Sequence, residues 1–443
     1  MPKRFVCALL NVGKKGEIIV NKKNCIKKLY AFLFCFLILS LNCCNGKNNN
    51  GVTYLTLTTT SYNEQIFTEL INSYNNSQNN YKVKLLVLGD ENEKNKQLKN
   101  NEIESDLMTF DNYIVANSYS DKLVDLSSEN FVYQYQFSIV NSLKAYTNKL
   151  SCLPSIGKFY SNCYNIDLFN ENNYTIPNTI DEFLDLITKI DTKNVSPSTF
   201  KIASSIASYD SILFSLMQIA YPLLLSTTEG NKFIYDYYYG NTTILNSTTN
   251  NSWGRIFKIL YQIYENNFYS LNDVYSNLQT ELDLFNNKET IAIQNSCDNN
   301  IDELISSNIN FQYFPFLGDT VDEQLIGSKP LFYLSALNDT SNIKKQGAID
   351  FLTYFSSNEG QNAIIATQKD NNSVSYIYKT FLPLNAKYQN FEKVIKQGKV
   401  FIPDIFFSLF NNFSTYIYSY LNNKLSLNEM LILFDNKIIE LNS

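Results

Sequence analysis

The sequence contains no histidine, and the residues that we consider for chemistry are its aromatic rings and its carboxylates. The absence of His removes the commonest general base, the usual catalytic triads and imidazole metal ligands. A glycosidase needs two carboxylates on opposite sides of a sugar, and no motif singles out such a pair. Binding through aromatic faces and hydrogen-bonding side chains is therefore favoured over catalysis. We expect no catalytic residue, no metal and no cofactor.

The stretch from Gly157 to Ile190 carries the clearest local pattern in the chain. An apolar, extended segment comes first and predicts a strand. Thr179 and Glu182 then form a capping box at the start of a helix, and apolar residues recur behind it at helical spacing. Ser426 and Glu429 form a second capping box before the last predicted helix. A strand, a turn and a helix in this order occur in many α/β proteins.

Strands and helices also alternate in the N-terminal part of the chain. Residues 52–58 and 81–88 predict two strands, and the segment from Ser61 to Tyr74 between them predicts a helix. Residues 106–110 predict a short buried strand. Strands joined through a helix form a right-handed parallel crossover. The loops at the carboxyl ends of parallel strands line the crevice in which open α/β sheets bind ligands.

The residue pattern of the stretch from Gly157 to Ile190 resembles that of a known family, the extracellular solute-binding proteins of the maltose-binding-like family of ABC importers. The matching positions are Tyr164, Asn165, Phe169, Pro177, Thr179 and Glu182. Ile180 stands where this family usually has Trp. Further similar segments follow in the family's order at 284–295, 346–361 and 381–383. The resemblance implies an α/β, two-lobed type II periplasmic binding protein fold with a ligand cleft between the lobes.

The same resemblance implies how the chain is divided between the lobes. We expect the first lobe to contain residues 52–152 and 295–335, and the second lobe to contain residues 153–294 and 336–443. The chain would cross between the lobes near 150–154, near 291–294 and near 334–338.

The resemblance also implies which residues line the cleft. They are Ser61, Tyr62, Phe110, Asp111, Asn112, Tyr113, Lys158, Phe159, Tyr160, Asp298 and Leu409. Sugar-binding relatives often have Trp at the positions that match Phe110, Asp298 and Leu409, whereas the only Trp of this chain, Trp253, lies elsewhere. Tyrosines could replace that aromatic platform. The alternative for each aromatic residue is a packed or surface side chain.

The N-terminus resembles the signal of a bacterial lipoprotein. A basic region precedes an apolar run at 29–41, and the run ends at Cys43 and Cys44. The run is short for a membrane span and typical of a signal sequence. We expect lipid attachment at Cys44, with Cys43 as the alternative, residues 1–43 as signal segment with an upstream extension, and 44–51 as a linker. The competing interpretation is an uncleaved membrane anchor.

Removal of residues 1–43 takes away eight Lys or Arg and one Glu, so the formal net charge falls from −6 to −13. A protein this acidic is a poor binder of nucleic acids. Three cysteines remain after Cys44, and they show no CxxC spacing of a zinc or redox motif. Cys152 and Cys163 could form a disulfide outside the cytoplasm, or they could be two buried thiols.

These patterns together predict an exported, lipid-anchored, monomeric receptor that captures a small solute, with a carbohydrate as the expected class, for the permease subunits of an ABC importer. The alternative is a surface lipoprotein that uses the same two-lobed fold for binding or adhesion without transport. Genes for two ABC permeases beside this one would separate the two hypotheses.

Overall fold

The computed structural model describes residues 51–144, 149–190, 209–268, 278–295, 305–368, 373–377 and 386–443. The predicted signal segment with Cys43 and Cys44 lies outside these ranges, as does Asp298. None of the helices in the described ranges is long and apolar enough to cross a membrane.

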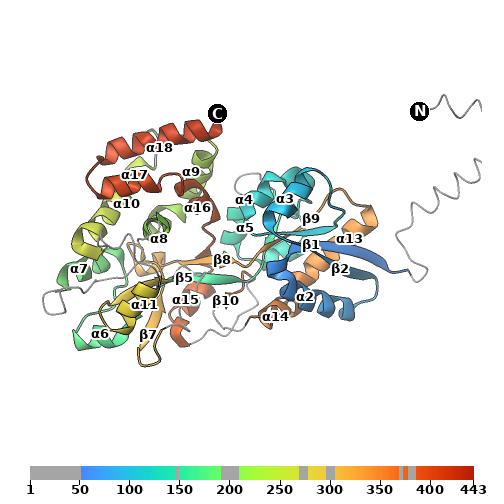
Figure 1. Ribbon diagram of the computed structural model, residues 1–443, viewed down its shortest axis with the longest axis horizontal. Coiled ribbons are helices and arrows are strands. Elements are labelled where there is room, and N and C mark those ends of the chain that lie inside the picture. Colours follow the sequence, from blue (N-terminus) through green and yellow to red (C-terminus); the bar gives the residue numbers. More distant parts are fainter. Residues whose placement is uncertain are drawn as a thin grey trace, which may run out of the picture. The chain divides into compact units, whose positions relative to one another are not determined.

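One sheet has five strands in the order β2-β1-β3-β9-β4 (Figure 1). The strands are β1 (Thr53–Thr60), β2 (Tyr81–Leu88), β3 (Leu107–Phe110), β4 (Leu153–Pro154) and β9 (Tyr333–Ala336). β1 runs parallel to β3, and β9 is antiparallel to both β3 and β4. The three strands predicted at 52–58, 81–88 and 106–110 are confirmed as β1, β2 and β3, because each combines β-branched residues with buried apolar positions.

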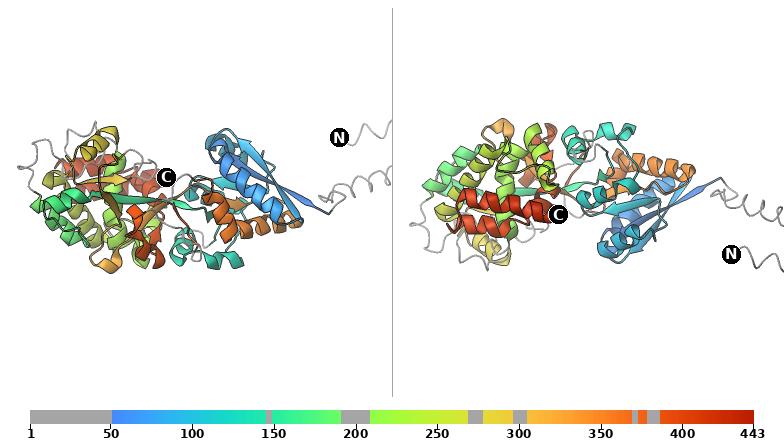
Figure 2. Two further views of the ribbon diagram at one scale, coloured as in Figure 1. Left: turned by 90° about the horizontal axis from the view of Figure 1, so that it is seen from below. Right: turned by 90° about the horizontal axis from the view of Figure 1, so that it is seen from above.

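Helices cover this sheet. They are α2 (Glu64–Ser77), α3 (Glu91–Lys99), α4 (Tyr113–Ser118), α13 (Asn342–Phe355) and α14 (Asn358–Ile365), whereas α5 (Phe137–Lys144) contacts the strand at Val400–Phe401. Apolar residues of α2 at helical spacing are buried, and the ring of Phe67 lies 4.7 Å from that of Phe332 just before β9. The Tyr74 hydroxyl of α2 donates to Asp350 of α13 at 2.7 Å. Helices far apart in the sequence therefore lie side by side (Figure 2).

The second sheet is built around the long strand β5 (Gly157–Asn165). Its strand order is β10-β5-β8-β11, and β6 and β7 also pair with β5. The other strands are β6 (Ala292–Asn295), β7 (Phe311–Phe314), β8 (Ile326–Pro330), β10 (Ser373–Val374) and β11 (Val400–Phe401). The first half of β5 pairs with β8, whereas the second half pairs with β6 and β7. The predicted strand at the start of the central stretch is thereby confirmed.

The remaining helices occur between and after the strands of the second sheet along the chain (Figure 1). They are α6 (Ile166–Glu171), α7 (Ile180–Lys189), α8 (Tyr209–Ala220), α9 (Thr228–Tyr238), α10 (Asn250–Ile263), α11 (Leu278–Asn286), α15 (Phe391–Lys396), α16 (Asp404–Phe410), α17 (Ser414–Leu421) and α18 (Leu427–Asn442). A π-helical turn, η5 (Tyr221–Leu225), follows α8 directly.

Both predicted helix starts are confirmed. The Thr179 hydroxyl accepts the amide of Glu182 at 3.3 Å at the start of α7. The Glu182 carboxylate accepts the amide of Asn178 rather than that of Thr179, at 2.7 Å. At α18, Ser426 and Glu429 form the complete reciprocal box. These caps satisfy amide groups that a helix start leaves without an intrahelical partner.

The sheets divide the chain differently from the expected lobes. Residues 295–335 were expected to belong to the first lobe together with residues 52–152. However, β7 and β8, which lie in this range, both pair with β5 of the second sheet. Only β9 returns to the five-stranded sheet, and α13 and α14, which were expected in the second lobe, pack with α2. The physical reason is that β5 is long enough to offer separate pairing edges to several returning strands.

The two cysteines proposed as a disulfide are buried thiols that are not bonded to each other. Cys152 precedes β4, whereas Cys163 lies in the second half of β5. An extended strand rises about 3.3 Å per residue, so Gly157 and Cys163 alone are separated by about 20 Å. A disulfide needs Cα atoms within about 7 Å. The alternative of two buried thiols is therefore correct.

Candidate ligand-binding site

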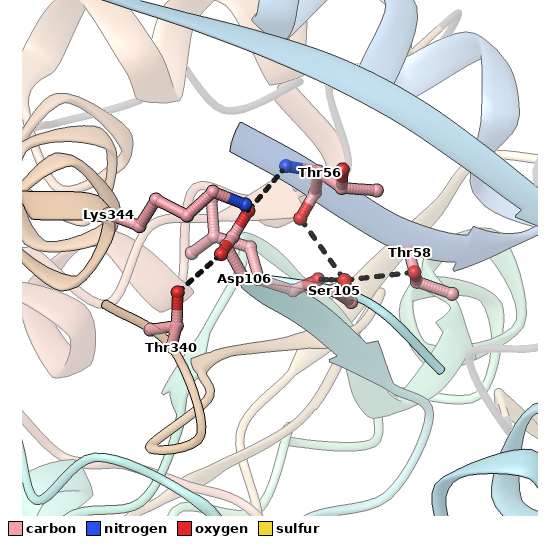
Figure 3. A network of polar contacts seen from close by, with 7 residues as sticks. Thr56, Thr58, Ser105, Asp106, Thr340 and Lys344 are labelled. Atoms are coloured by element: carbon pink, nitrogen blue, oxygen red, sulfur yellow. Dashed lines mark hydrogen bonds and ion pairs between the residues drawn. The ribbon is translucent and has the colours of Figure 1, made fainter. Parts of the chain in front are cut away.

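The amino end of β3 holds a polar network with a structural role (Figure 3). Asp106 is 2% exposed and accepts from the Thr56 amide at 2.9 Å, from the Thr340 hydroxyl at 2.6 Å and from the Lys344 ammonium at 3.1 Å. Both carboxylate oxygens therefore have protein partners. The network ties the start of α13 to β1 and β3, and a carboxylate whose two oxygens both accept from the protein has a structural role.

The opposite, carboxyl end of β3 carries four residues that were expected in the cleft. Phe110 is the last residue of the strand and is fully buried. Asp111 follows it and is exposed. The Asn112 side chain accepts the amide of Ile114 at 2.7 Å and so caps α4, which begins at Tyr113. The chain thus turns from β3 into α4 at the edge where parallel strands present their loops.

A buried lysine lies beside this turn. Lys94 of α3 is fully buried, donates to the Thr109 carbonyl oxygen and to Glu91, and lies 5.3 Å from the centre of the Phe110 ring. Burial lowers the pKa of Lys94. Burial also raises the pKa of Glu91 to about 7, against the opposing effect of Lys94, and Asp111 adds to the rise. A lysine and a carboxyl group, both with shifted pKa values, therefore lie beside the end of β3.

Tyr113 belongs to a second group of polar side chains, which we call the Asp404 cluster: Asp404, Tyr113, Tyr333 and Tyr235. The Asp404 Oδ2 atom accepts from the Tyr333 hydroxyl at 2.8 Å and from the Tyr113 amide at 3.3 Å. The Tyr113 and Tyr235 hydroxyls are hydrogen-bonded, and Tyr235 donates to the Ser142 carbonyl oxygen. The rings of Tyr113 and Tyr333 lie 6.1 Å apart.

The Asp404 cluster joins elements from both halves of the fold. Tyr113 and Tyr333 come from α4 and β9 at the five-stranded sheet, whereas Asp404 and Tyr235 come from α16 and α9. Burial raises the pKa of Asp404, while the Tyr333 hydroxyl, the Tyr113 amide and the charge of Lys329 act in the opposite direction. Burial likewise raises the pKa values of the tyrosine hydroxyls. The tyrosines therefore stay neutral and act as hydrogen-bond donors and acceptors.

The expected cleft residues of β5 have a different environment. Phe159 is buried against Tyr388 and Phe391, with ring centres 5.4 and 5.0 Å away. Tyr160 is 7% exposed and packs against Phe214 and Phe407 on the other face of the strand. These two rings are packed in the core. Their neighbour Lys158 is partly exposed and lies directly opposite Lys329 in β8.

Three further expected residues lie elsewhere. Ser61 is exposed after β1 and donates to the Gly89 carbonyl oxygen at 3.1 Å. Tyr62 is 82% exposed, so its ring is a surface side chain. Leu409 is buried within α16. The structure brings Tyr113 and Phe110 to one end of β3, but it does not place Tyr62, Phe159 or Tyr160 as open aromatic faces.

Sequence reasoning missed Asp404, Tyr333, Tyr235 and Lys94. Tyr333 stands in an apolar strand and gives no signal of a polar role. Asp404 follows a proline ahead of an apolar helix, and this pattern indicates a helix start, where an acidic residue needs no other reason. Within the described ranges, no group of three potential ligands could hold a metal ion.

A family model described as bacterial extracellular solute-binding protein matches residues 69–373. Comparison with curated protein sequences gave no match.

Three solved structures illustrate the likeness in fold. A family 1 extracellular solute-binding protein from Bifidobacterium longum subsp. infantis is 17% identical over 87% of this chain and 99% of that one, with a TM-score of 0.72. Apo RafE from Streptococcus pneumoniae is 14% identical over 90% and 100%, with a TM-score of 0.68. The sugar-binding protein MalE from Xanthomonas citri is 14% identical over 88% and 97%, with a TM-score of 0.68. The two-lobed α/β fold class predicted from the sequence is confirmed.

Proposed function

Because this chain belongs to the family of bacterial extracellular solute-binding proteins, we propose that it captures a small carbohydrate outside the cytoplasm and presents it to the permease of an ABC importer. It acts as a receptor and not as an enzyme. The observation that carries this proposal is the Asp404 cluster, in which hydrogen-bonding groups from α4 and β9 meet groups from α9 and α16. A two-lobed receptor needs contacts from both halves of its fold around one ligand.

The carbohydrate class rests on two supports. The Xanthomonas protein is a sugar-binding protein, and RafE has also been solved in complex with raffinose. In addition, a carboxylate such as that of Asp404 accepts hydrogen bonds from the hydroxyls of a sugar. Asp404 accepts from the amide of Tyr113, which follows the carboxyl end of β3, where α/β sheets bind ligands.

A screen of ligands tests the proposal. The melting temperature of the purified protein is measured with raffinose, stachyose, maltose and galactose, and in parallel with spermidine, a tripeptide and sulfate. A ligand that binds only the folded state raises the melting temperature by mass action. We expect a rise with at least one sugar, followed by a dissociation constant from calorimetry. A rise only with a peptide, a polyamine or an anion contradicts the carbohydrate class.

We further propose that the receptor is anchored through lipid on Cys44, with Cys43 as the alternative, so that it stays at the membrane beside its permease. Labelled palmitate should be incorporated into the protein in cells, and the double variant Cys43→Ser, Cys44→Ser should not be labelled. Labelling that persists in the double variant contradicts the anchor. Uptake of the bound sugar that is lost in cells without this protein, and restored by its gene, supports transport over adhesion.

A further inference from the structure

We propose that Asp404 selects the ligand: its Oδ1 atom accepts hydrogen bonds from the hydroxyl groups of a neutral sugar. This inference rests on the proposed function and adds to it the residue and the chemistry that choose the ligand.

The two oxygens of Asp404 are in different situations. Oδ2 is occupied by the Tyr333 hydroxyl and the Tyr113 amide. In the part of the chain that the structure describes, no donor contacts Oδ1. A carboxylate accepts about four hydrogen bonds, and Asp404 accepts two from the described residues, so about half of its capacity remains. The residue is also partly exposed, and a ligand can therefore reach it.

Other carboxylates of low exposure show what a structural role looks like in this fold. Asp106 uses both oxygens for protein donors. Asp435 is 7% exposed, and its two oxygens accept the amides of Ile244 at 2.8 Å and Leu245 at 3.3 Å. Each of these carboxylates is satisfied from within the chain. Asp404 differs because one oxygen is fixed by the protein and the other accepts nothing from the described residues.

The charges around Asp404 favour a neutral ligand. Lys329 in β8 acts on the carboxylate, and Lys158 lies directly opposite Lys329 on the neighbouring strand, so the two side chains share one face of the sheet. The positive charge of Lys329 offsets the negative charge of Asp404, so the pair offers neither a polyamine nor an anion a strong net attraction. A hydroxyl group carries no net charge and can donate to Oδ1.

The other titratable groups near Asp404 do not change this conclusion. They are Tyr113, Tyr333, Tyr235, Tyr221 and Cys152. Burial raises the pKa of each of them, so they are neutral near pH 7. Tyr333 is a positioning residue, because its hydroxyl bond fixes the orientation of the carboxylate and favours the charged form.

The test measures sugar binding by calorimetry in three variants, with raffinose, stachyose, maltose and galactose as probes and spermidine as the cation probe. Asp404→Asn should weaken the binding of the sugar about 10- to 100-fold, because a hydrogen bond to a charged group is lost. Asp435→Asn is the matched control. It should melt at a lower temperature, because a charged acceptor of two backbone amides is lost, and bind the sugar as wild type does.

A pH titration keeps the proposal testable if Asp404→Asn melts too low for calorimetry. Sugar affinity of the wild type should decrease as the pH falls and Asp404 becomes protonated. Tyr333→Phe removes a bond that favours the charged carboxylate, so the loss of affinity should occur at a higher pH than in wild type. A role of Tyr333 in stability alone would not move this pH dependence.

The outcomes separate the two proposals. If Asp404→Asn binds the sugar as tightly as wild type, or if the pH dependence is the same in Tyr333→Phe, the role of Asp404 is refuted while sugar capture stands. If spermidine binds, no sugar does, and Asp404→Asn abolishes spermidine binding, the neutral ligand class is refuted. If no sugar binds wild type or any variant, the proposed function fails as well.

Discussion

Replacement of Tyr113 by Ala tests whether this ring is a cleft surface or part of the core. A tyrosine that faces a cleft can be removed with little effect on folding. In the structure, however, Tyr113 is 2% exposed, packs beside Tyr333 and shares a hydrogen bond with Tyr235. We therefore expect Tyr113→Ala to destabilise the protein strongly.

The size of the effect follows from these contacts. Replacement of a buried aromatic residue by Ala costs about 3–5 kcal/mol, since both packing and a cavity contribute. Tyr113→Phe keeps the ring and removes one hydroxyl, and Tyr235 still donates to Ser142, so the cost should be about 0.5–1.5 kcal/mol. Tyr62 is 82% exposed, and Tyr62→Ala should lie within about 0.5 kcal/mol of wild type.

Urea unfolding provides the measurement. Trp253 is the only Trp and is fully buried among Phe233, Phe257 and Phe410, so its fluorescence reports on the second half of the fold, and far-UV circular dichroism reports on the whole. Coincident transitions justify a two-state free energy. If Tyr113→Ala and Tyr62→Ala have the same midpoint of urea unfolding, the assignment of Tyr113 to the core is refuted.

Three more predictions concern other parts of the fold. The pKa of Glu91 is raised to about 7 from an ordinary 4.5, so the folded state favours the protonated carboxyl. Protonated Glu91 therefore stabilises the folded state below about pH 4.5, and this contribution is lost as the pH rises through about 7. The melting temperature of wild type minus that of Glu91→Gln should therefore decrease from pH 5 to pH 8, and a constant difference contradicts it. Asp106→Ala should cost about 3 kcal/mol in urea unfolding, because Thr56, Thr340 and Lys344 lose a buried acceptor that they share. Lys344→Met should cost about 1 kcal/mol, and equal costs would be evidence against the network. Reductant should not change the melting temperature, since Cys152 and Cys163 are not bonded, and a drop of several degrees would disagree with two thiols.

Local patterns predicted the elements well, and pairing between distant strands poorly. β1, β2 and the start of α7 follow from alternation and from a capping box, which are properties of a few neighbouring residues. The pairing of β7 and β8 with β5 depends instead on which distant edge is available. A short strand such as β8, which reads Ile-Gly-Ser-Lys-Pro, has no pronounced pattern that assigns it to one sheet, so its sequence does not reveal its pairing partner.

The sequence indicated where in the fold the candidate site lies, but not which side chains are exposed there. The resemblance to the family implied Phe110 and Tyr113 as cleft residues, and both lie at the carboxyl end of β3, where α/β sheets bind ligands. Exposure could not be read from residue type, because tyrosine has an apolar body and a polar tip and fits either environment. Tyr62 and Tyr113 therefore looked equivalent in the sequence, although one is exposed and the other is buried.

The two ends of β3 differ in how completely the protein satisfies its own carboxylates. At the amino end, Asp106 is enclosed by donors from β1 and α13, and a ligand has nothing to add. Beyond the carboxyl end, Asp404 receives two donors from the described residues, both on Oδ2, and these come from elements of the five-stranded sheet. A buried acceptor without a partner is costly, so a fold retains such a group only where solvent or a ligand completes it. Partial exposure allows water to do so in the free receptor, and displacement of that water by sugar hydroxyls would then make Asp404 discriminate between ligands.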